Sequence, residues 1–451
     1  MQLFMLLSTA KKPIIYRFFG CALKLPYFFG AIICFSLSAP VFSTEVSRGE
    51  FTLYQAIQLS LQSHPSLKAY KHRFASVNAQ AKHAAIGEKP EINLMIEDTL
   101  GTGELTGLDN SQTTLSISWI LQSDLLNKRV KYAQTKKSVL EIEHDIQRFD
   151  VAAQAAHAFL AVLANQERLV VAKNAQNHAL QILKEIQKRV DAGRSPYADI
   201  LQAEVNLERR KLDAANIQQE LKSAKKVLAS QWGSNSVDFE CVNGMLTLNK
   251  QIVSYNSLEN AIKNNPQVRY FLTQQRVIDS EITLAREEVK NRLRLITGVR
   301  RYESTEDYGL SFGVSLPLGK STRNQHKVSA LHADRAAYAS DAWATQIQLS
   351  TQLYVLYQEL QHSHHLNNAI TYKILPRLEK ALTETQKAFS LGKYSYREWY
   401  ALQNEVLDTR MELIDVRLKA LNNMTEIERL TGLNLRETLT VKESENSGDI
   451  Q

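Results

Sequence analysis

Two long amphipathic helices joined by a tight turn constrain this chain more than any other feature, and they occupy residues 128–233. Gly193 is suited to end the first helix in the left-handed conformation, and Ser195 and Pro196 are suited to start the second as its N-cap and first residue. Apolar residues recur after the turn at Leu207, Ala214, Leu221 and Leu228, and before it at Ala172, Ala175, Ala179, Ile182 and Ile186. Helices of about 60 residues are ~90 Å long. The pattern predicts rods that pack along a seam of the coiled-coil type.

The N-terminus has the features of a secretory signal, which we expect to cover residues 1–43. Basic residues precede an apolar run over 25–37, and small residues suited to cleavage follow it. A retained membrane anchor is the alternative, although the run is shorter than the ~20 residues that a spanning helix needs. This segment holds four Lys or Arg and no Asp or Glu, so without it the net charge of +7 falls to +3. The basic balance is therefore weak evidence for nucleic acid binding, which we do not expect.

Cysteine usage is sparse: the chain has three, at Cys21, Cys34 and Cys241. The first two lie in the expected signal, and neither has a convincing lipoprotein context. We therefore expect a mature chain with one thiol and no internal disulfide. The low counts of 17 Gly and 9 Pro favour long regular elements over disorder.

The chain repeats itself with a constant offset around the helical turns. Residues 199 apart match at Gly193 and Gly392, Leu207 and Val406, Ala214 and Leu413, Leu221 and Ala420, Leu228 and Ile427, and Gly233 and Gly432. We predict two structural repeats, 51–233 and 257–433, joined by a linker over 234–256 and followed by a flexible tail over 434–451. Each repeat would open with a helix, over 53–88 or 258–291, and would carry a longer one, over 124–190 or 322–390.

Each repeat also contains a pair of short segments with alternating apolar and polar residues. These segments predict two strand hairpins, over 91–121 and 293–317. Each strand is about ten residues long, the length that crosses a bilayer when it is tilted. A solvated hairpin in a soluble protein gives the same alternation, so the strands alone leave both readings open.

Four short strands cannot close a membrane barrel, and lipid does not tolerate open sheet edges. Three copies of the chain would supply twelve strands, which is within the range of closed barrels. The fold class that we predict is therefore mainly α with a transmembrane β part. It consists of a long α-helical barrel of coiled-coil hairpins and a trimeric 12-stranded β-barrel with four strands from each protomer.

Taken together, these features resemble the TolC-type family of outer-membrane efflux channels over about 51–433. The resemblance rests on Leu53, Ala56, Ile57, His64 and Pro65 with their second copy, the paired hairpins, the two turns, and the heptads that end at Gly432. Further similarity to the CzcC-like heavy-metal branch rests on Ile96-Glu97-Asp98, Asn127-Lys128-Arg129 and Val314-Ser315-Leu316-Pro317-Leu318.

The resemblance implies a homotrimeric exit duct in the bacterial outer membrane, in contact with its lipid and extending into the periplasm. The duct would serve a tripartite pump with a periplasmic adaptor (membrane fusion) protein and an inner-membrane transporter of the RND type, and it would export heavy-metal cations. A multidrug or type I secretion duct is the alternative within the family. From a different class, a soluble periplasmic coiled-coil scaffold remains an alternative.

The resemblance places a candidate periplasmic gate and adaptor-contact tip at the two turns. Its residues are Gly193, Arg194, Ser195, Asp199, Gly392, Lys393, Tyr396, Arg397 and Glu398. Ordinary helix N-terminal chemistry is the alternative role for Asp199 and Glu398, because acids suit the first turn of a helix.

Other motifs indicate no enzyme, no cofactor and no resident metal. Gly319-Lys320-Ser321 lacks the glycine-rich cradle of a phosphate-binding loop. His362, His364 and His365 are expected to form a solvated patch, with a transient metal contact as the alternative. The basic run at 209–211 is expected to be a solvated helix face.

Overall fold

The computed structural model describes residues 51–248, 252–319 and 322–433. These residues divide into two compact units. Unit 1 comprises the described parts of Met1–His64, Val151–Tyr255 and Val355–Gln451, and unit 2 comprises Pro65–Asp150 and Asn256–Tyr354. The signal peptide expected for 1–43 and the tail expected for 434–451 lie outside the described residues.

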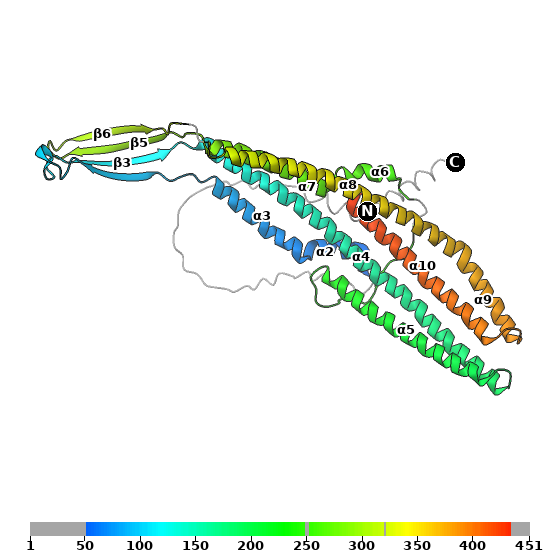
Figure 1. Cartoon of the computed structure of the whole chain (residues 1–451). Coiled ribbons are helices and arrows are strands. Elements are labelled where there is room, and N and C mark those ends of the chain that lie inside the picture. Colours follow the sequence, from blue (N-terminus) through cyan, green and yellow to red (C-terminus); the bar gives the residue numbers. More distant parts are fainter. Residues whose placement is uncertain (1–50, 249–251, 320–321, 434–451) are drawn as a thin grey trace, which may run out of the picture. The chain divides into compact units, whose positions relative to one another are not determined.

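Unit 2 contains a four-stranded antiparallel sheet in the order β2-β3-β5-β6 (Figure 1). Its strands are β2 (Glu91–Glu97), β3 (Gln112–Ile120), β5 (Arg294–Tyr302) and β6 (Tyr308–Ser315). β3 pairs with β5, with Leu115 opposite Val299, and so joins two hairpins that are far apart in sequence. The first hairpin loop contains a short 3-10 helix, η1 (Gly103–Leu105). β2 and β6 are the edges of the sheet.

The opening helix of each half is broken, contrary to the single helices expected over 53–88 and 258–291. The first consists of α2 (Leu53–Ser63) and α3 (Pro65–Ala84), and the second of α6 (Tyr255–Ile262) and α7 (Pro266–Glu288). His64 and Asn265, which precede the prolines, have ψ of 128° and 135°. The following proline disfavours helical backbone at these two positions, which explains both breaks.

The long helices that follow the hairpins differ from each other. α4 (Ser123–Asp191) is one helix of 69 residues, about 100 Å long at 1.5 Å per residue. Its counterpart consists of α8 (Gln325–Ala369), a π-helical segment η2 (Ile370–Ile374) and α9 (Leu375–Ser390), so the continuous helix expected over 322–390 is interrupted. Pro376 stands in the first turn of α9, immediately after the π segment. None of the helices in the described ranges has both the length and the apolar character needed to cross a membrane.

Two helical hairpins pack together in unit 1: α4 with α5 (Tyr197–Ser230), and α9 with α10 (Tyr396–Thr431). The heptad positions predicted from the sequence are buried in both. They are Leu207, Ala214, Leu221 and Leu228 in α5, and Val406, Leu413, Ala420 and Ile427 in α10. Further back along α4, Ala152, Ala155 and Ala156 pack against Ile57 of α2. The coiled-coil seam inferred from the sequence is thus confirmed.

Polar ties also join α4 to α10 inside unit 1. Nδ1 and Nε2 of His157 lie 2.8 and 2.7 Å from Asn422 Oδ1 and Glu426 Oε1. Burial disfavours the protonated imidazole, but these hydrogen bonds outweigh it and raise the pKa of His157. The hydrogen bond from His157 in turn lowers the pKa of the Glu426 carboxyl. Both shifts favour the charged forms of the pair, the imidazolium and the carboxylate.

The part of the linker over 234–248 contains regular structure. Its strand β4 (Val242–Asn243) pairs in parallel with β1 (Phe51–Thr52). Phe51 stacks on Phe239 with ring centroids 5.2 Å apart, and Trp232 packs against both rings. Cys241 is a free, exposed thiol beside this small sheet.

Candidate functional site

The two turns singled out in the sequence end their helices in the same way. Gly193 and Gly392 have φ of 67° and 74°, the left-handed region that glycine adopts without strain. In each turn the next amide donates to the carbonyl five residues back: Arg194 N to Arg189 O over 2.8 Å, and Lys393 N to Ala388 O over 2.9 Å. This is the Schellman arrangement of a helix C-terminus, as the glycine positions suggested.

The start of the next helix differs between the turns, and the role expected for Ser195 is wrong. α5 begins at Tyr197, so Pro196 occupies the N-cap position and no side chain caps the helix. Ser195 stands one residue too early to reach the first free amides. In the second turn no proline intervenes. Ser395 is the N-cap of α10 and forms a capping box with Glu398, whose carboxylate accepts a 2.8 Å hydrogen bond from Ser395 N.

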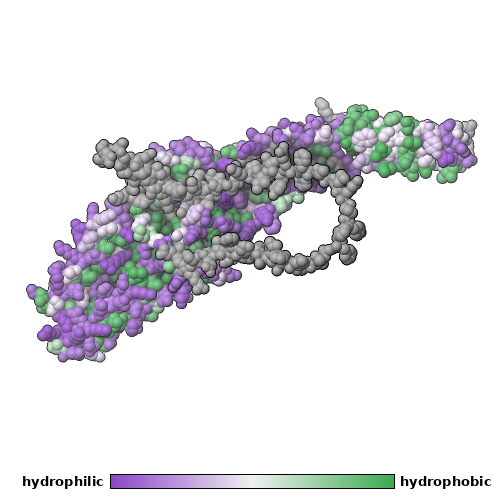
Figure 2. Space-filling model, turned by 180° about the vertical axis from the view of Figure 1, so that it is seen from behind, coloured by the Kyte–Doolittle hydropathy of each residue, from purple (hydrophilic) through white to green (hydrophobic). Residues whose placement is uncertain are grey.

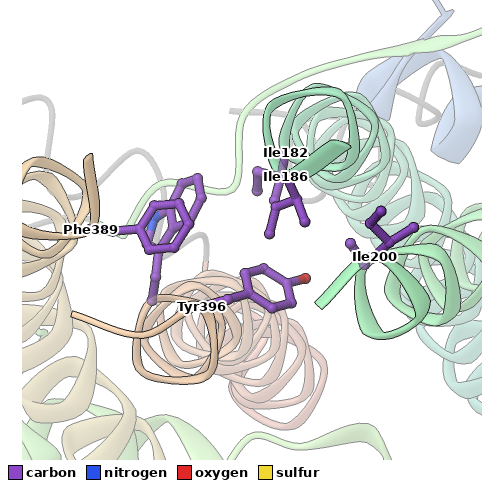
Figure 3. Close-up of a cluster of buried hydrophobic side chains, with 7 residues drawn as sticks. Ile182, Ile186, Ile200, Phe389 and Tyr396 are labelled. Atoms are coloured by element: carbon purple, nitrogen blue, oxygen red, sulfur yellow. The ribbon is translucent and has the colours of Figure 1, made fainter. Parts of the chain in front are cut away.

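A buried hydrophobic cluster lies beneath the turns and joins both hairpins (Figure 3). It contains Ile182, Ile186, Ile200, Ala203, Phe389, Tyr396 and Trp399. Phe389 stacks on Trp399 with ring centroids 4.9 Å apart. Tyr396, expected to be part of a polar gate, is buried here, and burial, followed by the neighbouring Tyr400, raises the pKa of its phenol to about 12. At physiological pH Tyr396 is therefore neutral.

Arginines from the first hairpin tie it to the second. Nη1 and Nη2 of Arg189 donate to Phe389 O and Ser390 O, at 2.8 and 2.9 Å, and the guanidinium lies 4.3 Å from the centre of the Phe389 ring. A cation at these last carbonyls of α9 also complements the negative end of the helix dipole. Arg210, expected on a solvated face, instead donates to Asn404 Oδ1 of α10 over 2.8 Å. Only the exposed flanks of the basic run, Arg209 and Lys211, fit that expectation.

The other candidate residues at the tip have various environments. Arg194, Lys393 and Arg397 are exposed. Burial raises the pKa of the Asp199 carboxyl, whereas hydrogen bonds from Ser395 lower the pKa of the Glu398 carboxyl. Glu398 thus has the helix-capping role that we weighed as an alternative. A gating role for the nine tip residues stays a prediction.

The sheet of unit 2 has one apolar face, formed by alternate residues of all four strands. These residues are Ile92, Leu94, Ile96, Leu115, Ile117, Trp119, Leu295, Val299, Leu310, Phe312 and Val314. Most are exposed, and Phe312 reaches 81%. Figure 2 shows hydrophobic side chains gathered on this end of the chain, with polar ones beyond them. An exposed apolar surface of this kind indicates contact with lipid or with another protein.

The opposite face of the sheet is mostly polar or small, apart from Met95, Ile120 and Ile296, and is more enclosed on β3. On β3, Thr114 and Ser118 are buried, although their neighbours Leu115 and Ile117 on the apolar face are exposed. Gly298 stands on this polar face. A Cβ built there would lie 2.6 Å from Leu115 O and 2.8 Å from Ser116 Cβ, so the strands meet too closely for any side chain. The sheet therefore curls toward its polar face.

Comparison with known proteins identifies a family and a relative that are similar to this chain. Residues 56–234 match the family described as outer membrane efflux protein. The cobalt-zinc-cadmium resistance protein CzcC of Cupriavidus metallidurans is 24% identical over 395 residues, which is 87% of this chain and 92% of that protein. Residues 56–234 thus belong to the outer membrane efflux protein family, and the similarity to CzcC extends over most of the chain. The efflux protein is thus a channel of the outer membrane that extends into the periplasm, and it is a transport protein rather than an enzyme.

Solved structures support the fold of the efflux protein. CusC superimposes with a TM-score of 0.68 at 16% identity, covering 84% of this chain and 91% of that one. VceC of Vibrio cholerae gives 0.68 at 15% identity, covering 85% and 97%. CmeC of Campylobacter jejuni gives 0.67 at 12% identity, covering 96% and 98%. The expectation of a mainly helical, TolC-like fold with long helices and a small sheet is confirmed.

No metal-binding constellation is evident among the residues that the structure describes, since no group of three or more His, Cys, Asp or Glu is arranged to hold an ion. His362 and His365 are exposed, and burial lowers the pKa of the half-buried His364. Of the Gly319-Lys320-Ser321 motif, only Gly319 lies in the described residues.

Proposed function

We propose that three copies of the efflux protein pool their sheets into one 12-stranded barrel in the outer membrane. The observation that carries this proposal is the sheet of unit 2, which has two unpaired edges and two contrasting faces. Main-chain groups at an open edge are costly in lipid, and pairing β6 of one copy with β2 of the next satisfies them. Curling toward the polar face turns the apolar face outward to lipid and encloses a polar lumen.

Aromatic residues at both ends of the apolar face support a membrane position. Trp119 stands at the end of β3 that leads into α4, and Tyr308 stands at the opposite end of the sheet, beside the hairpin loops. Membrane barrels have girdles of aromatic residues at both interfaces, where an amphipathic ring contacts headgroups. Leu310 and Phe312 of β6 and Leu94 of β2 occupy the band between them.

A run of small residues on α8 supports close packing between copies. Ala330, Ala333, Ala336, Ala337, Ala339 and Ala344 are all exposed in the single chain. The comparable alanines of α4, such as Ala152 and Ala155, are already buried within their own unit. Members of this family form trimers in efflux pumps, and the exposed alanines of α8 are a surface on which a second copy can pack closely.

We propose heavy-metal cations as the cargo, delivered by an inner-membrane transporter of the RND type through a periplasmic adaptor protein. The support is the similarity to CzcC, whose name describes cobalt, zinc and cadmium resistance, over most of both chains. In this proposal the adaptor meets the turns at Gly193 and Gly392, where exposed Arg194, Lys393 and Arg397 offer positive charge.

Assembly is tested with the full chain purified in mild detergent and added to planar lipid bilayers. We expect a trimeric mass by light scattering and stepwise conductance. A monomer in detergent that gives no conductance, or recovery of the protein only from soluble periplasm, would contradict the channel and favour a coiled-coil scaffold.

Cargo is tested by deleting the gene and restoring it on a plasmid. We expect the deletion to increase sensitivity to cobalt, zinc and cadmium salts and to leave tolerance to dyes and antibiotics unchanged. Greater sensitivity to dyes with normal metal tolerance would refute the metal cargo but leave the channel intact.

A further inference from the structure

The polar face of the sheet has four charged side chains on its strands, and all four are paired. Near the helix-proximal end, Arg294 Nη1 donates to Glu91 Oε2 over 2.7 Å. Near the hairpin loops, Arg300 Nη2 lies 3.1 Å from Glu97 Oε2. Each pair joins β5 to β2, so it crosses the intervening strand β3. The net charge of these four side chains is zero.

Arg300 is held by three different groups at once. Its Nε donates to Thr114 Oγ1 and its Nη1 to Gln112 Oε1, both over 2.9 Å, and its Nη2 donates to Glu97. Gln112 is itself fixed, because its amide nitrogen donates to Asp98 Oδ2 over 2.7 Å. All three guanidinium nitrogens therefore have acceptors on the sheet.

This geometry fixes the direction of the side chain. Adjacent strands are about 4.8 Å apart, so β5 and β2 are separated by about 10 Å of sheet, and the Arg300 and Glu97 side chains meet over β3. An arginine that reaches sideways over β3 lies along the sheet and does not project from it. On its other side, Arg300 is paired with Gly309 of β6, which has no side chain to hold it. Its lateral contacts thus come from β3 and β2.

We propose that Glu97 determines the charge selectivity of the passage by neutralising Arg300 and keeping it flat against the wall. This inference rests on the barrel proposed above, in which the polar face lines the lumen. Three copies then place three compensated arginines in one ring near the outer mouth. Cations pass this ring without meeting a net positive charge or a side chain that projects into their path.

The size of the effect follows from the charge at the ring. Without Glu97, three uncompensated guanidinium groups remain. For an ion about 10 Å from each, the Coulomb interaction in water, screened over the Debye length of ~10 Å at 0.1 M salt, lowers cation permeability about twofold and raises anion permeability about twofold, so the cation-to-anion ratio falls about fourfold. The effect grows at lower salt because the screening weakens.

The test uses the full-length protein in planar bilayers with a KCl gradient, where the reversal potential gives the permeability of K⁺ relative to Cl⁻. We expect E97Q to lower this ratio about fourfold and R300Q to raise it by a similar factor. The double variant E97Q/R300Q, which removes both charges, should return it close to the wild-type value.

A matched control is E303Q at the same end of the sheet. Glu303 pairs with Arg301 over 3.0 Å, and Arg301 alternates with Arg300 and so belongs to the apolar face. Its loss removes the same charge outside the lumen and should leave the ratio unchanged. The assignment of Glu97 would be overturned if E303Q changed the permeability ratio as much as E97Q does. It would also be overturned if the ratio of E97Q channels, or that of R300Q channels, equalled the wild-type ratio.

The same measurements distinguish an error in the proposed barrel from an error in the role of Glu97. If the wild-type protein conducts no ions, the channel itself is refuted. If wild-type channels form but E97Q yields none, R300Q decides alone, because the loss of its positive charge must still raise the ratio. An unchanged ratio in R300Q channels refutes the inference and leaves the channel intact.

Discussion

Replacing Gly298 with alanine tests whether the sheet is curled as tightly as the structure indicates. A Cβ at this position would lie 2.6 Å from Leu115 O, 2.8 Å from Ser116 Cβ and 2.9 Å from Ser311 Oγ. Ordinary van der Waals contact begins near 3.4 Å, so the backbone of β3 would have to move by about 0.8 Å. Forcing one extra carbon into such a contact costs about 1–3 kcal/mol.

That cost recurs in every subunit of an assembled barrel. If no strand relaxes, three copies of G298A therefore lower the free energy of unfolding of the assembled trimer by about 3–9 kcal/mol. The assay is the temperature at which the purified trimer dissociates in detergent, followed by native gel electrophoresis or light scattering. We expect a clearly lower dissociation temperature for G298A than for the wild type.

Gly313 provides a matched control on the same face of the sheet. A Cβ there meets its nearest neighbour, Ile296 Cβ, at 3.5 Å, which is ordinary contact. Gly→Ala has the same effect on the unfolded chain at both positions, so the difference between G298A and G313A isolates the clash. If the two variants dissociate at the same temperature, the reasoning on curvature is refuted.

Three further outcomes follow from contacts in unit 1. R189Q removes the two charged hydrogen bonds to the end of α9, at a cost of about 1–2 kcal/mol, so amide exchange at the second turn should accelerate about five- to thirtyfold. S395A removes a helix cap and should destabilise the start of α10 by about 0.5–2 kcal/mol, whereas S195A should have little effect because Ser195 caps nothing. The pKa of His157 is raised above its ordinary value of 6.5, and the pKa of Glu426 is lowered below its ordinary value of 4.5. Their pair therefore stabilises the fold most between pH 4.5 and 6.5. This stability is lost as pH rises through the folded pKa of His157 or falls through the folded pKa of Glu426. Thermal melting of E426Q beside the wild type should therefore differ most in that window.

Controls separate these effects from general changes in charge. Lys188 is an exposed neighbour of Arg189, and K188Q should leave exchange at the second turn unchanged. Equal acceleration in both variants would remove the specific role of Arg189. Equal loss in S195A and S395A would contradict the difference between the two caps. A gap between wild-type and E426Q melting that stays constant from pH 4 to 9 would contradict the ion pair.

Periodic features were predictable from the sequence because many residues share one constraint. The heptads through Leu207 and Val406 and the alternation through Leu115 and Phe312 each depend on a face that must be apolar. The two turns were predictable from the glycines that follow the long apolar patterns, because few other residues adopt positive φ. These rules are local, and a sequence carries them without reference to the rest of the fold.

Single contacts between distant segments were not predictable in this way. Arg189 and Phe389 are 200 residues apart, and no pattern distinguishes Arg189 from the other basic residues of α4. The network at Arg300 left a signal that could have been read: opposite charges, Glu97 and Arg300, at polar positions of neighbouring hairpins. The N-cap role expected for Ser195 was wrong because α5 begins one residue later than predicted. Pro196 takes the N-cap position itself, and no feature of Ser195 reveals this.

The π segment at Ile370–Ile374 has a consequence for how the second long helix tolerates change. A wider turn adds about one residue to the helical count and so rotates everything beyond it by roughly 100°. The buried stripes of α8 and α9 are therefore offset from each other around the helix axis, and a one-residue deletion within 370–374 should move Phe389 out of its cluster. In the uninterrupted α4 the buried stripe has one continuous phase, so an insertion anywhere along it misaligns every contact downstream.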